Sequence, residues 1–299
     1  GYGFFRSLGA RGHWQDTRRV FGGATTRLED YPEVCILLDR FMAPRCSGSV
    51  LTRYWILTAA HCITPNLGFA KYNTRTPMRT DVGDVVALRY LYKHPDYKVV
   101  QEDVGRGMDV TVLNHDLGLA HTRAPMALAQ HSPVPPLRAI LSYDPNQLFG
   151  EEVQVLGFGR TEASNKGEEL LTVFLRLVEC DRNGWRHCVC GVSRSLELPS
   201  GVCSGDSGGP VVYRGVQIGV TSMGPLSCAS DANETFPLGA TSVFTAVFPY
   251  RDIINRTIRE ADSSMRRSVP TSSAPTIAAK FIATLANIIL LVETNIIFV

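Results

Sequence analysis

The amino-acid sequence predicts an all-β protein, built as a barrel or a sandwich. Short apolar runs recur from Val34 onward, each of strand length, rich in Val, Leu, Ile, Phe and Tyr, and bounded by Gly, Pro, Asn or Asp. No long segment with the 3.6-residue period of a helix interrupts this series. Many short strands separated by turn residues are typical of β-barrels and β-sandwiches.

The expected strand regions follow one another along most of the chain. In order, they are 34–38, 49–60, 84–92, 109–120, 152–159, 170–178, 210–222 and 242–248. The proline-rich segment 131–150 interrupts the series and predicts a linker between two β subdomains. After the last region, Ile253, Ile254, Thr257 and Ile258 recur on one side of residues 250–261, which predicts a short helix.

The two ends of the chain differ from this middle part. Residues 1–19 are rich in Gly and Arg without periodicity, so we expect a flexible segment there. Residues 262–275 are rich in Ser, Arg and Pro, and an apolar stretch follows over 281–299. Because polar residues dilute that stretch, a GPI-attachment signal, a weak membrane span and an amphipathic tail all remain open.

Composition is that of a globular protein. Of the 299 residues, 44% are hydrophobic and 19% are charged, and the formal net charge is +2. A protein that binds nucleic acid would show a clear basic excess, so we expect no nucleic-acid partner. The sequence holds no cofactor motif and no acid-rich calcium loop, so we expect no cofactor.

Cysteine usage indicates an oxidising compartment. The eight cysteines form an even number in a Gly-rich chain, which favours disulfides and an extracellular, secreted protein. Two N-x-Thr sequons, at Asn233 and Asn255, agree with secretion and are the expected glycosylation sites. Cys188 and Cys190 lack the spacing of a zinc site, so no metal is expected.

Three short motifs together point to nucleophilic catalysis. His61 lies in LTAAHC, Asp116 in LNHDLGLA and Ser207 in GDSGGP. A serine hydroxyl is a poor nucleophile at neutral pH, and it needs an imidazole to take its proton and a carboxylate to orient that imidazole. With these motifs in this order, the sequence resembles the trypsin/chymotrypsin-type serine endopeptidases from about Val20 to about Ala261. Asp109 is the alternative carboxylate, but the LNHD context favours Asp116.

The resemblance implies an architecture and a division of the chain. We expect two six-stranded antiparallel β-barrels with a short C-terminal helix and the catalytic cleft between the barrels. We also expect a propeptide over 1–19, a peptidase domain over 20–262 whose barrels divide near residue 135, and a linker with a hydrophobic tail over 263–299.

The resemblance also implies that the enzyme is made as a zymogen. RRVFGG is similar to the family's activation junction, although Phe21 stands where relatives usually have Val or Ile. Cleavage after Arg19 would free the ammonium of Val20, which would pair with Asp206 beside the nucleophile. A buried ion pair of this kind can order the surrounding loops, so cleavage acts as a switch.

The glycines around Ser207 have a mechanical role in this interpretation. The tetrahedral intermediate needs converging backbone N–H donors, and the N–H groups of Gly205 and Ser207 are expected to supply them. Gly208 and Gly209 allow the backbone to fold tightly behind the nucleophile. The resemblance further implies the disulfides Cys46–Cys62 and Cys203–Cys228, with Cys180 paired to Cys190 or Cys188.

The expected specificity pocket lacks a negative charge. A pocket for Lys or Arg needs a buried carboxylate at its base, but Gly201 and Val202 occupy that place here. TSMG matches the family's substrate-binding strand: Ser222 would brace Asp116, Met223 would form a soft wall, and Gly224 would leave the mouth open. The pocket is therefore expected to take apolar residues.

These expectations describe a secreted serine endopeptidase that acts on proteins or peptides through an acyl-enzyme. Its expected partners are an activating protease, protein inhibitors of serine proteases and, if the tail is an anchor, a membrane. The alternative is a catalytically silent relative that serves as a binding or cofactor protein. We interpret His94, His115, His121, His131 and His187 as surface or loop residues.

Overall fold

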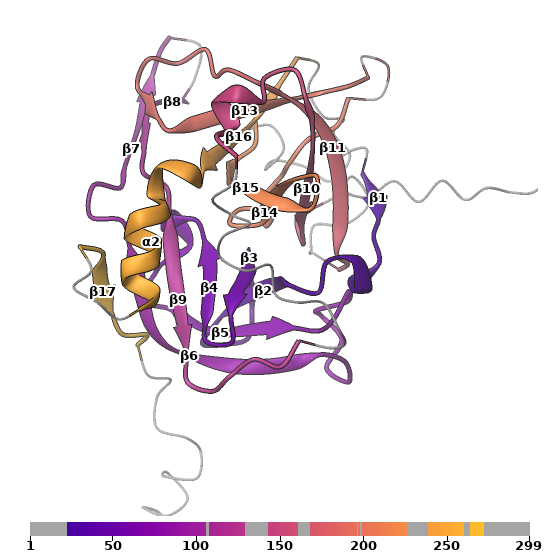
Figure 1. Cartoon of the computed structure of the whole chain (residues 1–299), viewed down its shortest axis with the longest axis vertical. Helices are drawn as coiled ribbons and strands as arrows, with labels where there is room; N and C mark the ends of the chain where they lie inside the picture. The colour runs from indigo at the N-terminus through magenta and orange to yellow at the C-terminus, as the bar shows by residue number, and fades with distance from the viewer. Residues whose placement is uncertain are drawn as a thin grey trace, which may run out of the picture.

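The computed structural model describes residues 23–105, 108–128, 143–160, 168–195, 197, 199–225, 239–259 and 264–271. In this part of the chain, strands form two barrels that lie one above the other in Figure 1, with the helix α2 on their flank. Several predicted features lie outside the described residues: Arg19 and Val20, most of the proline-rich linker, Cys228, Asn233 and the apolar tail.

The N-terminal barrel closes because strand β6 pairs with both β5 and β9. Its six strands are β2 (Val34–Asp39), β3 (Pro44–Thr52), β4 (Trp55–Thr58), β5 (Leu67–Tyr72), β6 (Asp84–Lys93) and β9 (Gly118–Thr122). All of their pairings are antiparallel. A short strand near the C-terminus, β17 (Arg266–Ser268), adds to the outside of β6.

The C-terminal barrel closes in the same way, because β11 pairs with both β10 and β13. Its six strands are β10 (Glu152–Gly157), β11 (Leu171–Val178), β13 (Cys188–Ser193), β14 (Pro210–Tyr213), β15 (Val216–Met223) and β16 (Thr241–Ala246). The two-residue strand β1 (Ala24–Thr25) pairs with the outside of β11. The expected pair of six-stranded antiparallel barrels is therefore confirmed.

Helical structure is short and confined to a few places. The helix α2 (Arg251–Ile258) follows the last barrel strand and confirms the expected C-terminal helix. The remaining helical turns of the described residues are 3-10: η1 (Leu28–Asp30), η2 (Ala60–Cys62), η3 (Pro145–Gln147) and η5 (Phe248–Tyr250). The turn η2 matters most, because it carries His61.

Three of the predicted strand regions each contain two strands. Region 49–60 holds the end of β3 and all of β4, and region 210–222 holds β14 and β15 around a two-residue turn in which Arg214 and Gly215 have φ of 48° and 78°. Region 109–120 divides at His115, whose φ is 53°. Such two- or three-residue connections leave almost no trace in an apolar run, so the sequence pattern missed them.

A third, three-stranded sheet stands beside the barrels. A hairpin of β7 (Lys98–Asp103) and β8 (Met108–Asn114) is joined by the parallel strand β12 (Trp185–Arg186). The sequence pattern did not predict β7 or β12, because their residues are mostly polar and exposed. This hairpin lies between His61 and Asp116 in the chain and forms one wall of the candidate site.

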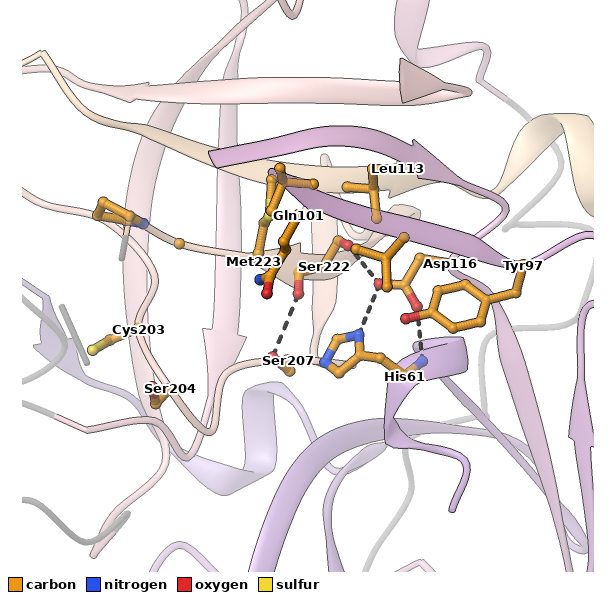
Figure 2. Close-up of a pocket in the computed structure, with 14 residues that line it drawn as sticks. His61, Tyr97, Gln101, Leu113, Asp116, Cys203, Ser204, Ser207, Ser222 and Met223 are labelled. Carbon is orange, nitrogen blue, oxygen red and sulfur yellow. Dashed lines mark hydrogen bonds and ion pairs between the residues drawn. The ribbon is translucent and has the colours of Figure 1, made fainter. Parts of the chain in front are cut away.

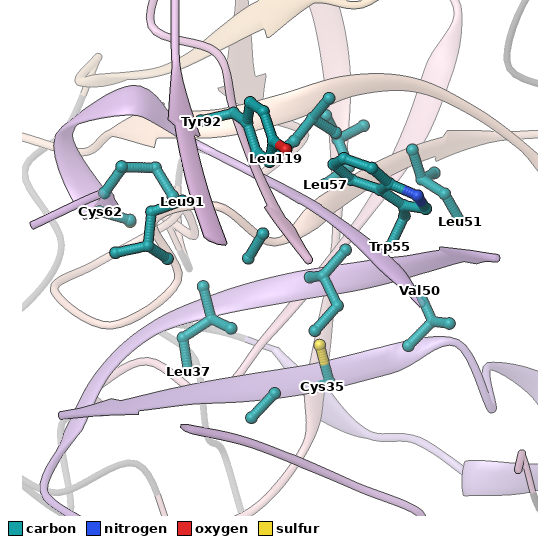
Figure 3. Close-up of a cluster of buried hydrophobic side chains, with 14 of the residues drawn as sticks. Cys35, Leu37, Val50, Leu51, Trp55, Leu57, Cys62, Leu91, Tyr92 and Leu119 are labelled. Atoms are coloured by element: carbon teal, nitrogen blue, oxygen red, sulfur yellow. The ribbon is translucent and has the colours of Figure 1, made fainter. Parts of the chain in front are cut away.

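The core of the N-terminal barrel explains why these sequences form strands. Figure 3 shows side chains from successive strands meeting inside the barrel, among them Leu37, Val50, Leu57 and Leu119. Trp55 is part of the same cluster, as expected for a core residue. The opposite face of β2 packs against β10 and its following turn through Ile36, Leu156 and Phe158, so the two barrels share a second apolar cluster.

Candidate active site

His61 lies at the junction of the barrels. It follows β4 in the turn η2, and the disulfide Cys46–Cys62 ties that turn to β3. The imidazole is partly exposed and opens toward the cleft, whereas the flanking residues Ala60 and Cys62 are buried. The backbone therefore holds the ring at the cleft with little freedom.

Asp116 lies opposite, in the short connection between β8 and β9. One carboxylate oxygen accepts a hydrogen bond from the His61 backbone N–H at 2.9 Å, and the other lies 2.8 Å from His61 Nδ1. The hydroxyl of Ser222 donates to that second oxygen at 2.5 Å. Figure 2 shows these three contacts converging on Asp116.

The carboxylate of Asp116 is held in its ionised form. Its side chain is only 1% exposed, and this burial alone would raise its pKa. The charge of His61 and the hydrogen bonds from His61 and Ser222 outweigh the burial, so the pKa of Asp116 lies below its usual value. An ionised Asp116 accepts a hydrogen bond from the N–H at Nδ1 of His61, so the proton of the ring stays on Nδ1 and the Nε2 lone pair is free to act as a base.

The alternative carboxylate, Asp109, has different partners. It lies on β8, where its side chain forms an ion pair with Arg182 at 2.7 Å. The Asp116 carboxylate, in contrast, contacts His61 directly.

Ser207 is held in the cleft by the other barrel. Its backbone carbonyl accepts a hydrogen bond from the Ser47 N–H at 2.8 Å, which links the nucleophile loop to β3. Its hydroxyl lies beside the His61 ring in Figure 2 and donates to the Ser222 carbonyl at 3.5 Å. Such a long contact is easily exchanged for one with His61, as is common in sites without substrate.

Two backbone donors flank this hydroxyl. Gly205 has a φ of 99°, and a side chain there would press against the Gly159 backbone, so glycine is needed. Within the described residues, the N–H groups of Gly205 and Ser207 have no hydrogen-bond acceptor. The Ser47 hydroxyl donates to the Gly205 carbonyl at 2.8 Å, so it helps to orient this loop. The sequence reasoning missed Ser47, whose only signal is its place beside Cys46.

Asp206 is buried behind the nucleophile. Its two oxygens accept hydrogen bonds from the Gly159 N–H at 2.8 Å and the Cys203 N–H at 2.9 Å. Burial nevertheless raises its pKa to about 7. No cation faces this carboxylate among the described residues, and Val20, its expected partner, lies outside them.

A cleft of about 320 Å³ contains His61, Asp116 and Ser207. The hairpin and the loop before β7 supply one wall, and the opposite wall comes from the loop that carries Ser207 and from the end of β15. The residues around the triad are Tyr97, Val99, Gln101, Val110, Leu113, Cys203, Ser204, Ser222, Met223, Gly224 and Pro225. The hairpin residues were not predicted from sequence, because only the tertiary structure brings them to the cleft.

Comparison with known proteins agrees with this geometry. A family model described as Trypsin matches residues 22–254, which is most of the chain. The chain belongs to the trypsin family. It is therefore a serine endopeptidase, as the motifs around His61, Asp116 and Ser207 indicated.

Relatives of this trypsin-family chain come from organisms as different as the three named here. It is 27% identical over 244 residues to trypsin of Saccharopolyspora erythraea, covering 79% of this chain and 96% of that protein. It is 28% identical to chymotrypsin-2 of Vespa crabro, covering 79% and 99%. It is 26% identical to vitamin K-dependent protein C of Rattus norvegicus, where it covers 83% of this chain but only 53% of the relative.

The expected pocket base of the trypsin-family chain lies behind the cleft. Gly201 and Val202 are both buried, and neither lines the cleft. Gly224 lies so close to the Val202 backbone that a side chain on Gly224 would overlap the Val202 carbonyl. The Val202 N–H donates to the hydroxyl of the buried Ser242 at 3.1 Å. The wall that carries Val202 therefore contacts the wall that carries Gly224, whereas the sequence predicted that Gly224 would leave the mouth of the pocket open.

The cysteines of this peptidase divide into bonded and free ones. The structure contains the disulfides Cys46–Cys62 and Cys180–Cys190, and Cys203 is also disulfide-bonded. Cys35 and Cys188 are free thiols. Of the two alternatives for Cys180, the structure therefore has the bond to Cys190, which closes a loop that carries β12.

Three further expectations concern metal, sugar and membrane. Within the described residues, the one group of converging metal-ligand atoms is Cys46, His61 and Cys62, and the two cysteines are bonded to each other. Asn255 lies in α2, half-buried, and the Thr257 hydroxyl of its sequon donates to the Ile253 carbonyl at 2.7 Å. No helix of the described part is long and apolar enough to cross a bilayer.

Proposed function

We propose that this trypsin-family endopeptidase cuts peptide bonds with a triad of His61, Asp116 and Ser207. The observation that carries this proposal is the 2.8 Å contact between the buried carboxylate of Asp116 and His61 Nδ1, with the Ser207 hydroxyl in the same cleft. This arrangement leaves Nε2 of the imidazole as the base nearest to the nucleophile.

In the first half of the reaction, the Ser207 oxygen attacks the substrate carbonyl while His61 Nε2 takes the hydroxyl proton. Asp116 stays ionised and stabilises the imidazolium. The oxyanion that forms accepts hydrogen bonds from the N–H groups of Gly205 and Ser207. His61 then gives its proton to the leaving amine, and the acyl group remains on Ser207.

In the second half, water attacks the acyl-enzyme. His61 takes a proton from that water and later returns it to the Ser207 oxygen as the acid product leaves. Atoms and protons balance over the cycle without any cofactor.

Activation is proposed to follow cleavage after Arg19. The new Val20 ammonium would pair with Asp206, whose carboxylate is buried and lacks a cation among the described residues. Because Asp206 lies beside Ser207 and its loop also carries Cys203, this pairing would also separate the walls at Val202 and Gly224. The propeptide is residues 1–19, and the peptidase domain starts at Val20. The expected domain end at residue 262 is too early, because Met265 packs in the N-terminal barrel core and β17 pairs with β6, so the linker and tail would begin after residue 271.

Substrate specificity is proposed to be apolar. The cleft is lined by the apolar side chains of Val99, Val110, Leu113 and Met223. Among its described lining residues, the one carboxylate belongs to Asp116, which is already hydrogen-bonded to His61. Gly201 and Val202 offer no charge at the pocket base. A lysine or arginine side chain would therefore lose its hydration without a partner. Since Arg19 is basic, a separate protease of basic specificity would perform the activation.

Labelling with a serine-directed phosphonate tests the triad. After cleavage at Arg19 and confirmation of the Val20 terminus, we expect one phosphonate per chain, on Ser207, and none on the matched Ser207→Ala variant. A correctly cut chain that takes up no phosphonate would instead be the silent binding or cofactor relative.

A peptide library tests the specificity. The activated enzyme should prefer Phe, Leu, Met or smaller apolar residues before the cut bond. A preference for Lys or Arg would contradict the apolar pocket.

Secretion is proposed from the cysteines. The disulfides Cys46–Cys62 and Cys180–Cys190 form and persist in oxidising compartments, and glycosylation at Asn233 and Asn255 would accompany secretion. Treatment with a phosphatidylinositol-specific lipase tests whether residues 281–299 anchor the enzyme. Release of the enzyme into solution supports a GPI anchor, whereas retention in the membrane fraction supports a hydrophobic span.

A further inference from the structure

A cluster of imidazoles lies directly behind the candidate triad. The ring of His115 stacks on that of His94, with centroids 4.5 Å apart and planes within 6° of each other. The His187 ring lies 5.7 Å from His115 on the other side. The ring of Tyr250 packs edge-on against all three, and its hydroxyl lies 3.0 Å from His115 Nδ1.

The cluster reaches from the interior to the surface. His94 is only 8% exposed and Tyr250 is buried, His115 is half-buried, and His187 is exposed. His94 Nδ1 accepts a hydrogen bond from the Asp96 N–H at 3.2 Å. His94 lies in the loop between β6 and β7, as the sequence predicted, but it is buried rather than at the surface. The interpretation of His121 as a surface or loop residue was wrong, because His121 is buried in β9, outside the cluster.

Other ionisable groups lie next to each of the three histidines in the chain. They are Lys93 and Asp96 next to His94, Asp116 next to His115, and Arg186 and Cys188 on either side of His187. Asp96 favours protonation of His94 and His115, whereas Arg186 opposes protonation of His115 and His187. The nearest group of mechanistic importance is Asp116, which follows His115 in the chain.

The backbone couples His115 rigidly to Asp116. His115 has a φ of 53°, an unusual conformation for a residue with a side chain. The Leu117 N–H donates to the His115 carbonyl at 2.8 Å, and the His94 N–H donates to the Leu117 carbonyl at 3.1 Å. The His94–His115 stack and the hydrogen bond to Tyr250 therefore stabilise the turn that presents Asp116 to His61.

The imidazoles are uncharged at neutral pH. Burial and the neighbouring His115 lower the pKa of His94 to about 4, although Asp96 opposes this. Burial also lowers the pKa of His115 and of His187, with further lowering by His187 and by Arg186, respectively. Proton uptake in acid would place like charges on rings 4.5 Å apart, where repulsion is strong because water is partly excluded.

We propose that His94, His115 and His187, with Tyr250, are positioning residues that hold Asp116 in place while uncharged and displace it reversibly when they take up protons. The enzyme is therefore inactivated by acid through this cluster. This inference rests on the proposed triad and adds an acid-sensitive support to it.

The slope of the pH profile tests the proposal. We expect the slope of log kcat against pH in the cut full-length enzyme to become steeper than one as the pH falls toward 4, because the cluster then takes up protons in addition to the single ionisation that a general base contributes. In the His115→Asn variant, the slope should become one, whatever the kcat at pH 8. A merely structural role for His115 would lower kcat at every pH and leave the slope steep. A wild-type slope of one would overturn the proposal.

A matched control uses another buried histidine. His121 packs against Trp55 and Tyr54, outside the cluster. The His121→Gln variant should keep the steep slope of the wild type. If it loses the steep slope as His115→Asn does, the effect is a general one of losing a buried imidazole, and the positioning role is wrong.

NMR of the Ser207→Ala chain provides a second test that needs no activity and no folded His115 variant. Protonating His61 alone keeps its hydrogen bond to Asp116, so the low-field resonance of that shared proton would persist in acid. We expect this resonance to disappear reversibly as His94 and His115 titrate below pH 6. Persistence of the resonance, or titration of both rings near pH 6.5, would refute the cluster's role. If the resonance disappears as expected in the Ser207→Ala chain, but the cut wild-type enzyme has no peptidase activity, then only the proposed catalysis is refuted.

Discussion

At the scale of single residues, Asp116 is the most constrained group of the site. It is buried, yet the His61 ring, the His61 backbone and the Ser222 hydroxyl together keep it ionised. A buried carboxylate with three directed donors cannot rotate, so it specifies both the tautomer and the orientation of His61. Sequence reasoning preferred Asp116 over Asp109 from motif context, and the contacts give the physical reason for that preference.

The two carboxylates allow a matched mutational test. Asp116→Asn should reduce kcat by about 10⁴-fold, the effect that loss of this carboxylate has in serine peptidases, because the wrong tautomer of His61 is stabilised. Asp109→Asn, which breaks only the ion pair with Arg182, should change kcat by less than about tenfold, since exposed ion pairs contribute about 0–1 kcal/mol. Steady-state kinetics on one peptide substrate measures both. Equal losses in the two variants would exclude Asp116 as the triad member.

At the scale of elements, the β7–β8 hairpin shapes the cleft because the C-terminal barrel supports it. The Trp185 indole N–H donates to the Val110 carbonyl at 3.1 Å, and the Leu113 N–H donates to the Gly184 carbonyl at 3.3 Å. Both supports belong to the loop that the disulfide Cys180–Cys190 closes. The hairpin is thus a firm wall, and we expect it to select substrates.

Two equally exposed valines of this hairpin test that role. Val99 lines the cleft and is 44% exposed, whereas Val104, at the far end of β7, does not line it and is 45% exposed. Val99→Asp should raise KM for apolar peptides by about 10- to 100-fold with little change in kcat, because it removes binding energy common to ground and transition states. Val104→Asp should leave KM unchanged. Identical KM values for all three enzymes would show that the hairpin does not touch substrate.

The short strand β17 connects the end of the chain to the N-terminal barrel. Met265, just before it, is only 5% exposed and belongs to the barrel core, although it lies beyond the residues that the family model matches. The segment continues to Thr271, whose N–H and hydroxyl both donate to the Pro65 carbonyl at 2.8 Å. This segment therefore stabilises the barrel that carries His61.

Unfolding measurements test this contribution. Met265→Ala should lower the free energy of unfolding by about 2–4 kcal/mol, because it leaves a cavity in the core. The control Val269→Ala, four residues further on and 58% exposed, should change it by less than about 0.5 kcal/mol. Urea titration of both variants in the Ser207→Ala background avoids self-digestion. A Met265 variant as stable as the control would show that β17 is dispensable for the fold.

At the scale of the whole molecule, the proposed activation would change the electrostatic surroundings of the buried Asp206. Between the ordinary carboxyl pKa of 3.8 and the folded value of about 7, the unfolded chain ionises Asp206 while the folded, uncut chain does not. The unfolded state then binds fewer protons, so the stability of the uncut chain falls as pH rises, by roughly 4 kcal/mol in total. In the cut chain, the Val20 ammonium would stabilise the ionised form of Asp206, so the free energy of unfolding would no longer fall as the pH rises.

The stability gained on cleavage should therefore depend on pH. Comparing cut and uncut Ser207→Ala chains, we expect little difference near pH 4 and a growing advantage of the cut chain up to pH 8. The difference between the two forms cancels the titration of groups that they share, such as the histidines behind Asp116. Chemical denaturation at several pH values measures it, and a difference that does not increase with pH would argue against pairing of Val20 with Asp206.

The sequence predicted the features that depend on neighbours in the chain. Short apolar runs bounded by turn residues indicated the strands, and the short motifs around His61, Asp116 and Ser207 indicated the chemistry and the family. It missed the barrel strands β5 (Leu67–Tyr72) and β13 (Cys188–Ser193), whose apolar runs are short and interrupted by Gly. It also missed β7 and β12, because exposed polar strands have no hydrophobic period, and it merged strands across the turn at Arg214 and Gly215. It also placed His121 at the surface or in a loop, and it did not predict that His94 is buried, because a lone His carries no pattern that reports burial.

By itself, the sequence determined the all-β class, because short apolar runs and turn residues predict strands locally. It also determined the two-barrel family and the residues expected to perform catalysis, because short motifs identify both. Only the tertiary structure decided what surrounds those residues. Packing brings the hairpin to the cleft, Ser47 to the nucleophile loop, and His94 and His187 to the turn before Asp116. These contacts join residues far apart in the chain, and they depend on how two closed barrels pack together rather than on any short stretch of sequence.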